Sequence, residues 1–512
     1  MSERKDSCKS CRETNNACDK KRPRCGQCAS QGKMCGGYDM GRIFINVNSS
    51  SPPPIWSRSA NAQKYLVLDL KSQSHDPENP GASISRPSSS LSFHSHSGLS
   101  MATLEPALPD VSSSEKDPAD IRSIVDTFLK LYYRRYGQAE ASIELLTSGQ
   151  EIGGWRRLLP YWIGRSPTLD MAIRSLAASF VGAQYEDLNL IDQGRDLYLQ
   201  ALQMVQRALS EPDSASRKDV LVTTLAMSSI ELFLSNGATS SQSAHIEGAN
   251  RLLESVIQTE EIEEIHLHAL NQGLFQAISM RQRYIFSDPS YRHLVHRLYC
   301  VPRTSHNNLF FQWCETIIPL PNILHAIDSI SSPTSSSQPS THTVLSILED
   351  IQALEHAMVP WYEQLKASSP GAWTFPTAQT GSADSVPFPL QFVSIETCTL
   401  YCLHWSSQLL ILEARQVLNL YLPPSEFANQ PSTAVLLPQL AEYASLICRS
   451  VQFCTENRSF AASENMFLPL YAVAGFYQRQ NDEKRMKWCA GAFTRVAAQQ
   501  KIGYAVGHFN LQ

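Results

Sequence analysis

The chain has 512 residues, of which 43% are hydrophobic and 18% are charged, and its formal net charge is −5 at pH 7. This length is sufficient for at least two folded units, and the composition excludes fibrous and collagen-like proteins. The first residues have no apolar stretch typical of a secretory signal, and the most hydrophobic segment, 390–421, carries too many polar side chains for a bilayer span, so we expect an intracellular protein with no membrane partner.

Charge is distributed unevenly along the chain. Residues 1–42 contain ten basic and five acidic side chains, a net charge of +5, which leaves −10 for the rest. A small basic head on a large acidic body indicates a protein whose head binds phosphates and whose body binds other proteins.

Six of the thirteen cysteines lie within 28 residues of the head. They form two copies of Cys-x2-Cys-x6-Cys: Cys8, Cys11, Cys18, Cys25, Cys28 and Cys35. A structural zinc ion takes four ligands and favours closely spaced thiolates, so six cysteines can hold two Zn2+ ions only if two thiolates bridge them. The repeat assigns the bridges to the first cysteine of each half, Cys8 and Cys25. The alternative, a disulfide knot, requires an oxidising compartment.

This pattern resembles the DNA-binding domain of the fungal Zn2Cys6 binuclear-cluster transcription factors. All six spacings match, and the loop 19–24 (Asp-Lys-Lys-Arg-Pro-Arg) is similar to the family's loop between two short helices. The resemblance implies that residues 1–46 fold around two zinc ions and that the first short helix enters the major groove of double-stranded DNA. So small a segment has almost no apolar core, so we expect metal binding to supply most of its folding free energy.

The groove helix departs from the family pattern. The resemblance places basic residues at positions 14 and 15 against a CGG-type triplet, whereas this chain has Thr14 and Asn15. Asparagine favours adenine, so either the specificity has changed or only backbone contacts remain, and these position a protein without specifying sequence. Both alternatives stay open for a CGG-like half-site. The candidate DNA-binding residues are Lys9, Arg12, Thr14, Asn15, Lys20, Lys21, Arg22 and Arg24.

Residues 47–116 are rich in serine and proline and have no heptad repeat. Such a composition cannot bury enough apolar surface to become ordered. We therefore predict a disordered linker between the head and the body.

From residue 117 onward, hydrophobic residues recur at helical spacing. Ile121, Ile124 and Phe128 share a face, with Asp117 as N-cap and Pro118 in the first turn. Similar patterns predict helices at about 168–183, 190–210, 217–235, 243–257, 344–366, 389–421, 435–456 and 466–500, with exposed loops at 331–343 and 368–389. The predicted fold class is mainly all-α, with a large helical array over 117–512.

Two stretches of the body, 169–202 and 245–253, resemble the fungus-specific regulatory domain that follows these zinc clusters in the family. In the second stretch, His245, Gly248 and Leu252 share one helix face. We interpret this face as core packing around a hydrogen-bonded histidine, with the small pair Gly248 and Ala249 allowing another helix to approach closely.

Enzymatic motifs are not found in the sequence: it contains no Gly-x-Gly-x-x-Gly, phosphate loop, Gly-x-Ser-x-Gly or His-Glu-x-x-His. The segment 263–268 (Glu-Glu-Ile-His-Leu-His) has the side chains of a metal chelate, but we interpret it as a solvated helix face. The seven cysteines outside the head lie in apolar patterns and are expected to be buried.

The sequence therefore predicts a nuclear, zinc-dependent, DNA-binding transcription regulator of RNA polymerase II genes in a fungus. We expect the transcription machinery or co-regulators as further partners and no enzymatic activity. The alternative function is a helical interaction protein or co-regulator that keeps the zinc fold but has weak sequence-specific DNA binding.

Overall fold

The computed structural model divides the chain into two units, residues 1–103 and 104–512. In the first unit it describes residues 11, 14, 16–19, 25–31 and 33. In the second it describes 118–133, 154–210, 217–234, 239–257, 262–301, 308–331, 339–374, 388–427, 430–456 and 458–500. The predicted linker, 47–116, lies outside the described residues, as does the predicted N-cap Asp117.

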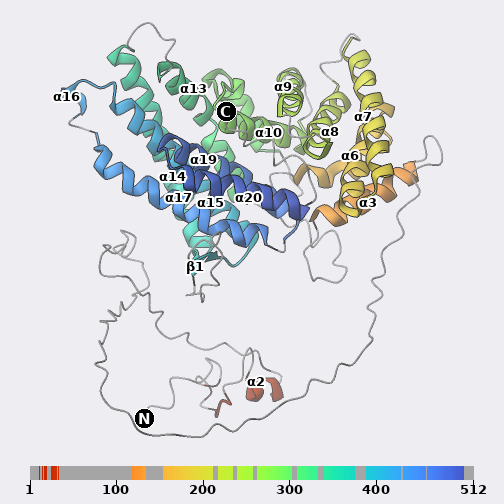
Figure 1. The fold of residues 1–512 in the computed structure, drawn as a ribbon, viewed down its shortest axis with the longest axis horizontal. Helices are drawn as coiled ribbons and strands as arrows, with labels where there is room; N and C mark the ends of the chain where they lie inside the picture. The colour runs from red at the N-terminus through yellow and green to blue at the C-terminus, as the bar shows by residue number, and fades with distance from the viewer. Residues whose placement is uncertain are drawn as a thin grey trace, which may run out of the picture. The chain divides into compact units, whose positions relative to one another are not determined.

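Helices dominate the described part of the second unit (Figure 1). Its N-terminal part contains α3 (Pro118–Tyr133), η3 (Gly154–Leu158), α5 (Leu159–Trp162), α6 (Pro167–Tyr185), α7 (Leu188–Leu209), α8 (Lys218–Leu234), α9 (Thr239–Val256) and α10 (Glu264–Met280). Next come η5 (Ile285–Ser287), η6 (Pro289–Tyr291), α11 (Arg292–Tyr299), α12 (Asn308–Ile317), α13 (Leu320–Ser331) and α14 (Thr341–Ser368). The C-terminal part contains α15 (Ile395–Asn419), α16 (Pro424–Phe427), α17 (Thr433–Thr455), α18 (Phe460–Glu464), α19 (Phe467–Arg479) and α20 (Glu483–Gln500).

One short strand pair interrupts the helices. Strands β1 (Trp373–Thr374) and β2 (Leu390–Gln391) pair antiparallel at the two ends of the predicted loop 368–389. The predicted all-α fold class is confirmed.

Most of the predicted helix ranges are confirmed, including that of α8, which is buried along most of its length. The helices α6, α7, α8, α9, α14 and α17 lie close to their predicted ranges. The pattern missed α10 to α13, and α10 is buried from Glu264 to Asn271, which removes the contrast between faces that periodicity detects. It also fused α19 with α20, which are separated by a turn where Asn481 has a φ of 54°. The range predicted to start at 389 begins as a helix only at Ile395.

Helices α8 and α15 each contain a long stretch that is buried on every side. Every residue from Val220 to Ile230 in α8 and from Thr397 to Ser407 in α15 is buried. Helix α8 packs against α6 and α9, and α15 packs against α14, α17 and α19. Helix α10 contacts both α9 and α19 and so links the two groups of helices (Figure 1).

Helices α6 and α7 form a tightly packed hairpin. Ser166 caps α6 by accepting a hydrogen bond from the Leu169 amide, at 3.2 Å, and Asp187 caps α7. Between them, Glu186 adopts a left-handed conformation with a φ of 60°. In the interface, a Cβ added to Gly194 would lie 2.4 Å from Ser179 Oγ and 2.9 Å from its backbone nitrogen. The hairpin therefore depends on a missing side chain at position 194.

The glycine singled out by sequence, Gly248, does not have this role. A Cβ there would meet only Thr224 Cγ2, at 3.7 Å, which is ordinary van der Waals contact. The close approach to α9 comes instead from α10, where a Cβ on Gly273 would lie 2.1 Å from Asn250 Oδ1. The histidine of the same face, His245, is hydrogen-bonded as expected: its Nε2 lies 2.9 Å from the Tyr198 hydroxyl.

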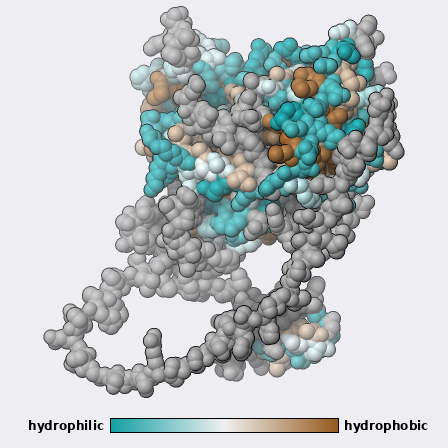
Figure 2. Space-filling view, turned by 45° about the vertical axis from the view of Figure 1, so that its right-hand side comes forward, coloured by the Kyte–Doolittle hydropathy of each residue, from teal (hydrophilic) through white to brown (hydrophobic). Residues whose placement is uncertain are grey.

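The surface of the second unit is mixed. The face seen in Figure 2 is mostly hydrophilic, with separate hydrophobic groups. The exposed large apolar side chains come from different elements, such as Leu199 of α7, Val359 of α14 and Val435 of α17. None of the described helices is both long and apolar enough to span a bilayer. Six of the seven cysteines outside the head are buried as predicted, but Cys300, at the end of α11, is exposed.

The two glycines provide a matched test of the hairpin. Gly194→Ala should lower the free energy of unfolding by about 1–3 kcal/mol because the added methyl overpacks the interface with Ser179. Gly248→Ala should instead raise it by about 0.5–1 kcal/mol because alanine is the better helix former and space is present. Urea unfolding followed by circular dichroism measures both changes. Equal effects of the two substitutions would contradict this account of the interface.

Candidate functional site

Four of the six head cysteines are described, and their thiols gather around Cys25. Cys25 Sγ lies 3.6 Å from Cys11 Sγ, and Cys28 Sγ lies 3.8 Å from Cys11 Sγ. Cys25 also caps the short helix α2 (Gly26–Ser30), where its sulfur accepts a hydrogen bond from the Cys28 amide at 3.3 Å. The local turn therefore brings the second Cys-x2-Cys pair onto one side of α2.

These thiols form two overlapping groups that could hold a metal ion. The ligand atoms of Cys11, Cys25 and Cys28 lie within 4.8 Å of one another, and so do those of Cys18, Asp19 and Cys25. Two thiolates bound to one zinc ion, at Zn–S distances of about 2.3 Å, are roughly 3.8 Å apart. The 3.6 Å separation of Cys11 and Cys25 fits this geometry. Cys25 belongs to both groups, and the second group has the carboxylate of Asp19 in place of a third thiol.

The thiol cluster is shielded from solvent although the head is small. Cys25 is fully buried, and Cys11 and Cys28 are 2% and 4% exposed, with Cys18 packed against them. These cysteines are the whole of this small core among the described residues of the head. Cys8 and Cys35 lie outside the described residues, and both predicted bridges, at Cys8 and at Cys25, stay predictions.

Asp19 is a positioning residue that the sequence reasoning passed over. Its Oδ1 accepts a hydrogen bond from the Gly26 amide at 2.8 Å, which ties the loop after Cys18 to the first residue of α2. A Cβ on Gly26 would lie 2.6 Å from Asp19 Oδ2, so the contact needs glycine at position 26. The sequence offered two signals for this contact. An aspartate directly follows the ligand cysteine Cys18, and a glycine directly follows the next ligand cysteine, Cys25.

Most of the predicted DNA-contacting residues lie outside the described part of the head. They are Lys9, Arg12, Asn15, Lys20, Lys21, Arg22 and Arg24. Thr14 is described and is exposed, next to a turn in which the Asn16 amide donates to the Cys11 carbonyl at 2.9 Å. The contact of Thr14 with DNA stays a prediction.

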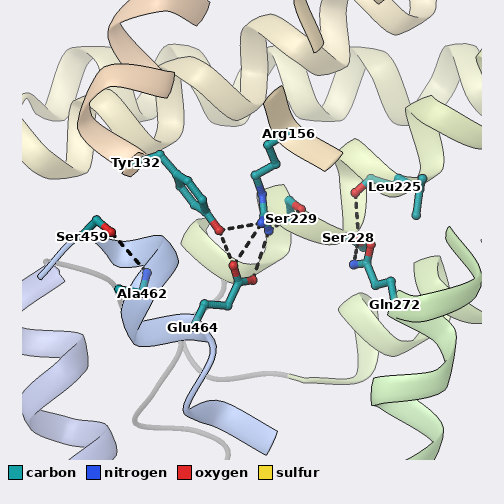
Figure 3. A network of polar contacts seen from close by, with 9 residues as sticks. All are labelled: Tyr132, Arg156, Leu225, Ser228, Ser229, Gln272, Ser459, Ala462 and Glu464. Atoms are coloured by element: carbon teal, nitrogen blue, oxygen red, sulfur yellow. Dashed lines mark hydrogen bonds and ion pairs between the residues drawn. The ribbon is translucent and has the colours of Figure 1, made fainter. Parts of the chain in front are cut away.

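The second unit contains a buried ionic network (Figure 3). Arg156 of η3, 2% exposed, donates to Glu464 of α18, with nitrogen–oxygen distances of 3.1 and 3.3 Å. It also donates to the Tyr132 hydroxyl at 2.6 Å and to Ser229 Oγ at 2.9 Å. The Tyr132 hydroxyl in turn donates to Glu464. The network joins α3, η3, α8 and α18, whose residues are as far apart in sequence as 132 and 464.

The charge states of this network follow from burial and pairing. Burial by itself lowers the pKa of Arg156, but Glu464, Tyr132 and Tyr133 together raise it above its usual range, so the guanidinium stays charged. Burial raises the pKa of Tyr132 well above its usual range, so the phenol keeps the proton that it donates to Glu464. Both groups therefore hold their protons at physiological pH, which is the behaviour of a structural clamp rather than of an acid–base pair.

The segment 263–268 is not the solvated helix face that the sequence suggested. Glu264, His266 and His268 are at most 9% exposed because the start of α10 packs against η3. Glu264 pairs with Arg157 at 2.7 Å. Burial lowers the pKa of His266 to about 4, and the neutral ring accepts a hydrogen bond from the Glu263 amide at 2.8 Å. These side chains provide hydrogen-bond and ion-pair partners at the N-terminus of a buried helix.

Comparison with known proteins gave one match. A family model described as the fungal specific transcription factor domain matches residues 143–503, which is more than half of the chain. No curated protein and no solved structure matches.

The ionic network predicts strong coupling between Arg156 and Glu464. Arg156→Met should lower the free energy of unfolding by about 3–5 kcal/mol because it leaves a buried carboxylate without its partner. Adding Glu464→Gln should recover part of that loss, and urea unfolding of the two single variants and the double variant measures the coupling. The exposed pair Arg195–Asp192 is the control, and Arg195→Met should change stability by about 0–1 kcal/mol. Additive effects at 156 and 464 would refute the coupling.

Proposed function

Because the chain belongs to the fungal specific transcription factor domain family, we propose that it is a zinc-dependent, DNA-binding regulator of RNA polymerase II genes that acts in the nucleus. Its proposed domains are a Zn2Cys6 head at 1–46, a linker at 47–116 and a helical regulatory domain at 117–512. Double-stranded DNA is the proposed partner of the head, and the transcription machinery or co-regulators are the proposed partners of the body. No catalytic role is proposed for any residue.

The observation that supports the zinc-dependent head is the position of Cys25 within two overlapping groups of possible metal ligands, Cys11–Cys25–Cys28 and Cys18–Asp19–Cys25. In the proposed cluster, one zinc ion binds Cys8, Cys11, Cys18 and Cys25, and the other binds Cys8, Cys25, Cys28 and Cys35. The described thiols are grouped differently from this assignment: Cys11 and Cys28, assigned to different ions, lie 3.8 Å apart, whereas Cys11 and Cys18, assigned to one ion, fall in separate groups. The bound ions would supply the folding free energy that so small a core lacks.

Asp19 supports the same proposal from the backbone side. Its carboxylate fixes the start of α2 at 2.8 Å, so that Cys25 and Cys28 are presented together. The groove helix before it would carry the contacts to DNA, and Thr14 is exposed there. The alternative function, a co-regulator that keeps the zinc fold but has weak sequence-specific DNA binding, is motivated by the same residue because threonine is not a guanine-reading cation.

The zinc stoichiometry tests the cluster. The full chain should bind two zinc ions, measured by elemental analysis of purified protein, and a chelator should unfold the head. Cys25→Ser should lose both ions because it removes a shared ligand, whereas the matched control Cys300→Ser, at an exposed cysteine of the body, should keep both. One zinc ion per unmodified chain, with two titratable thiols in the head, would refute the bridged cluster.

The DNA preference distinguishes the two functions. Thr14→Arg combined with Asn15→Lys should raise the preference of the full chain for a CGG-containing duplex over a scrambled one by about tenfold or more. A bidentate contact to guanine contributes roughly 1–3 kcal/mol of discrimination. Affinities are compared at fixed salt because added charge also strengthens nonspecific binding. Ser30→Lys with Gln31→Lys, at exposed positions at the end of α2, is the charge-matched control and should leave the ratio unchanged.

Two results would contradict this interpretation of positions 14 and 15. One is a preference of the unmodified chain for CGG of roughly a thousandfold, as specific regulators show. In that case other residues, Arg12 and Lys9 first, carry the recognition. The second is a ratio that rises equally in the charge-matched control.

A further inference from the structure

One cysteine of the body differs from the other six. Cys300, at the end of α11, is exposed, whereas the other thiols of the body are buried. Its Sγ lies 3.6 Å from Nε2 of His296, one helical turn earlier, and Nδ1 of the same ring lies 2.8 Å from Glu315 Oε1 on α12. Two helices thus bring a thiol, an imidazole and a carboxylate into one hydrogen-bonded chain on the surface.

The carboxylate determines which nitrogen of the histidine ring carries the proton. A carboxylate can only accept, so Nδ1 of His296 donates to Glu315. In the neutral ring the other nitrogen, Nε2, then has a lone pair and accepts from the Cys300 thiol. A nucleophile within reach of a base that a third group orients is the arrangement that activates thiols in covalent chemistry. Transfer of the thiol proton to Nε2 leaves a thiolate beside an imidazolium.

The surface around this thiol carries further positive charge. Arg292 and Arg297 are exposed on α11, and no ion pair joins either arginine to a residue that the structure describes. Since Glu315 offsets the charge of the imidazolium, these two arginines give the exposed side of α11 its net positive charge. The C-terminal end of a helix disfavours an anion, so a thiolate at Cys300 depends on the imidazolium and on these cations. Exposed thiols in positively charged surroundings are the reactive ones, and buried thiols are inert.

We propose that Cys300 is a site of reversible modification by negatively charged low-molecular-weight disulfides. The thiolate of Cys300 attacks one sulfur of the disulfide, and a new S–S bond joins that half to the protein. The other half leaves as a thiolate and takes the proton held by His296, so one disulfide is consumed, one thiol is released and no further oxidant is needed. Arg292 and Arg297 attract the anionic reagent. Exposed mixed disulfides are easily reduced, so the modification follows the thiol–disulfide balance of the compartment.

Three disulfides of different charge test the site on the full zinc-loaded chain: dithiodiglycolate, a dianion, 2-hydroxyethyl disulfide, which is neutral, and cystamine, a dication. Mass spectrometry of the intact chain follows adduct formation with time, and peptide mapping locates the adduct. At low salt the adduct should form at Cys300 about tenfold faster with the dianion than with the dication, because the arginines raise the local concentration of the anion. Added salt should reduce this ratio.

Substitutions on α11 and α12 assign the chemistry. His296→Gln removes the base and should slow exchange with all three disulfides by about tenfold or more, whereas the matched control His293→Gln, an exposed histidine of the same helix, should leave the rates unchanged. Arg292→Gln combined with Arg297→Gln should bring the ratio of dianion to dication rates close to one. Glu315 is a positioning residue: Glu315→Ala should slow exchange, and Glu315→Gln, which keeps an acceptor for Nδ1, should restore part of the rate.

Three results would overturn the proposal: no adduct at Cys300, equal rates with the dianion and the dication at low salt, or the same rate in the His296→Gln and His293→Gln variants. Circular dichroism of each variant checks that the body is folded. The site uses neither zinc nor DNA, and zinc stoichiometry and DNA preference are measured separately, so these results do not bear on the proposed function.

Discussion

The helical body depends on neutralising a cation that it encloses. A guanidinium cannot lose its proton, and burying it without a partner would cost more than a domain's net stability allows. Arg156 is therefore held by Glu464, Tyr132 and Ser229, which come from α18, α3 and α8. Helix α18 has only five residues and would be marginal by itself. The last residue of α18 is Glu464, and its carboxylate interacts with η3 and α3. This interaction connects the beginning of the body to its end.

The same acidic side chain also lines a cavity between α10 and α19. Glu464 pairs with Arg156 on one side and lines this cavity on the other. A hydrogen bond between α8 and α10 is ordered in a similar way. Ser228 of α8 donates to the Leu225 carbonyl of its own helix, so it accepts from the amide nitrogen of Gln272 on α10 and orients that amide. Polar residues in buried helices thus do two things. They satisfy each other's hydrogen-bonding groups, and they fix the orientation of neighbouring helices.

The head follows a different principle. Its described core consists of cysteines, and the hydrogen bond from the Gly26 amide to Asp19 turns the second cysteine pair toward the first. With so little apolar surface, a hydrophobic core cannot hold this segment together. The thiol spacing therefore carries the structural information that side-chain packing carries in the body. The family model matches residues 143–503, which lie within the body. The thiol arrangement of the head is therefore a separate observation from the family match.

The sequence alone was sufficient for the features that depend on local spacing: the cysteine repeat, the amphipathic helices such as α7 and α14, and the all-α class. It failed at several places where the packing partners are distant in sequence. The start of α10 looked like a solvated face because charged residues are usually exposed, yet η3 covers it. Gly248 looked like the point of close approach, but Gly194 and Gly273 have that role. Periodicity indicates which face of a helix is apolar. It does not indicate which element packs against that face. That partner, like the pairing of Arg156 with Glu464, depends on contacts between residues hundreds of positions apart, and only the tertiary structure decides these contacts.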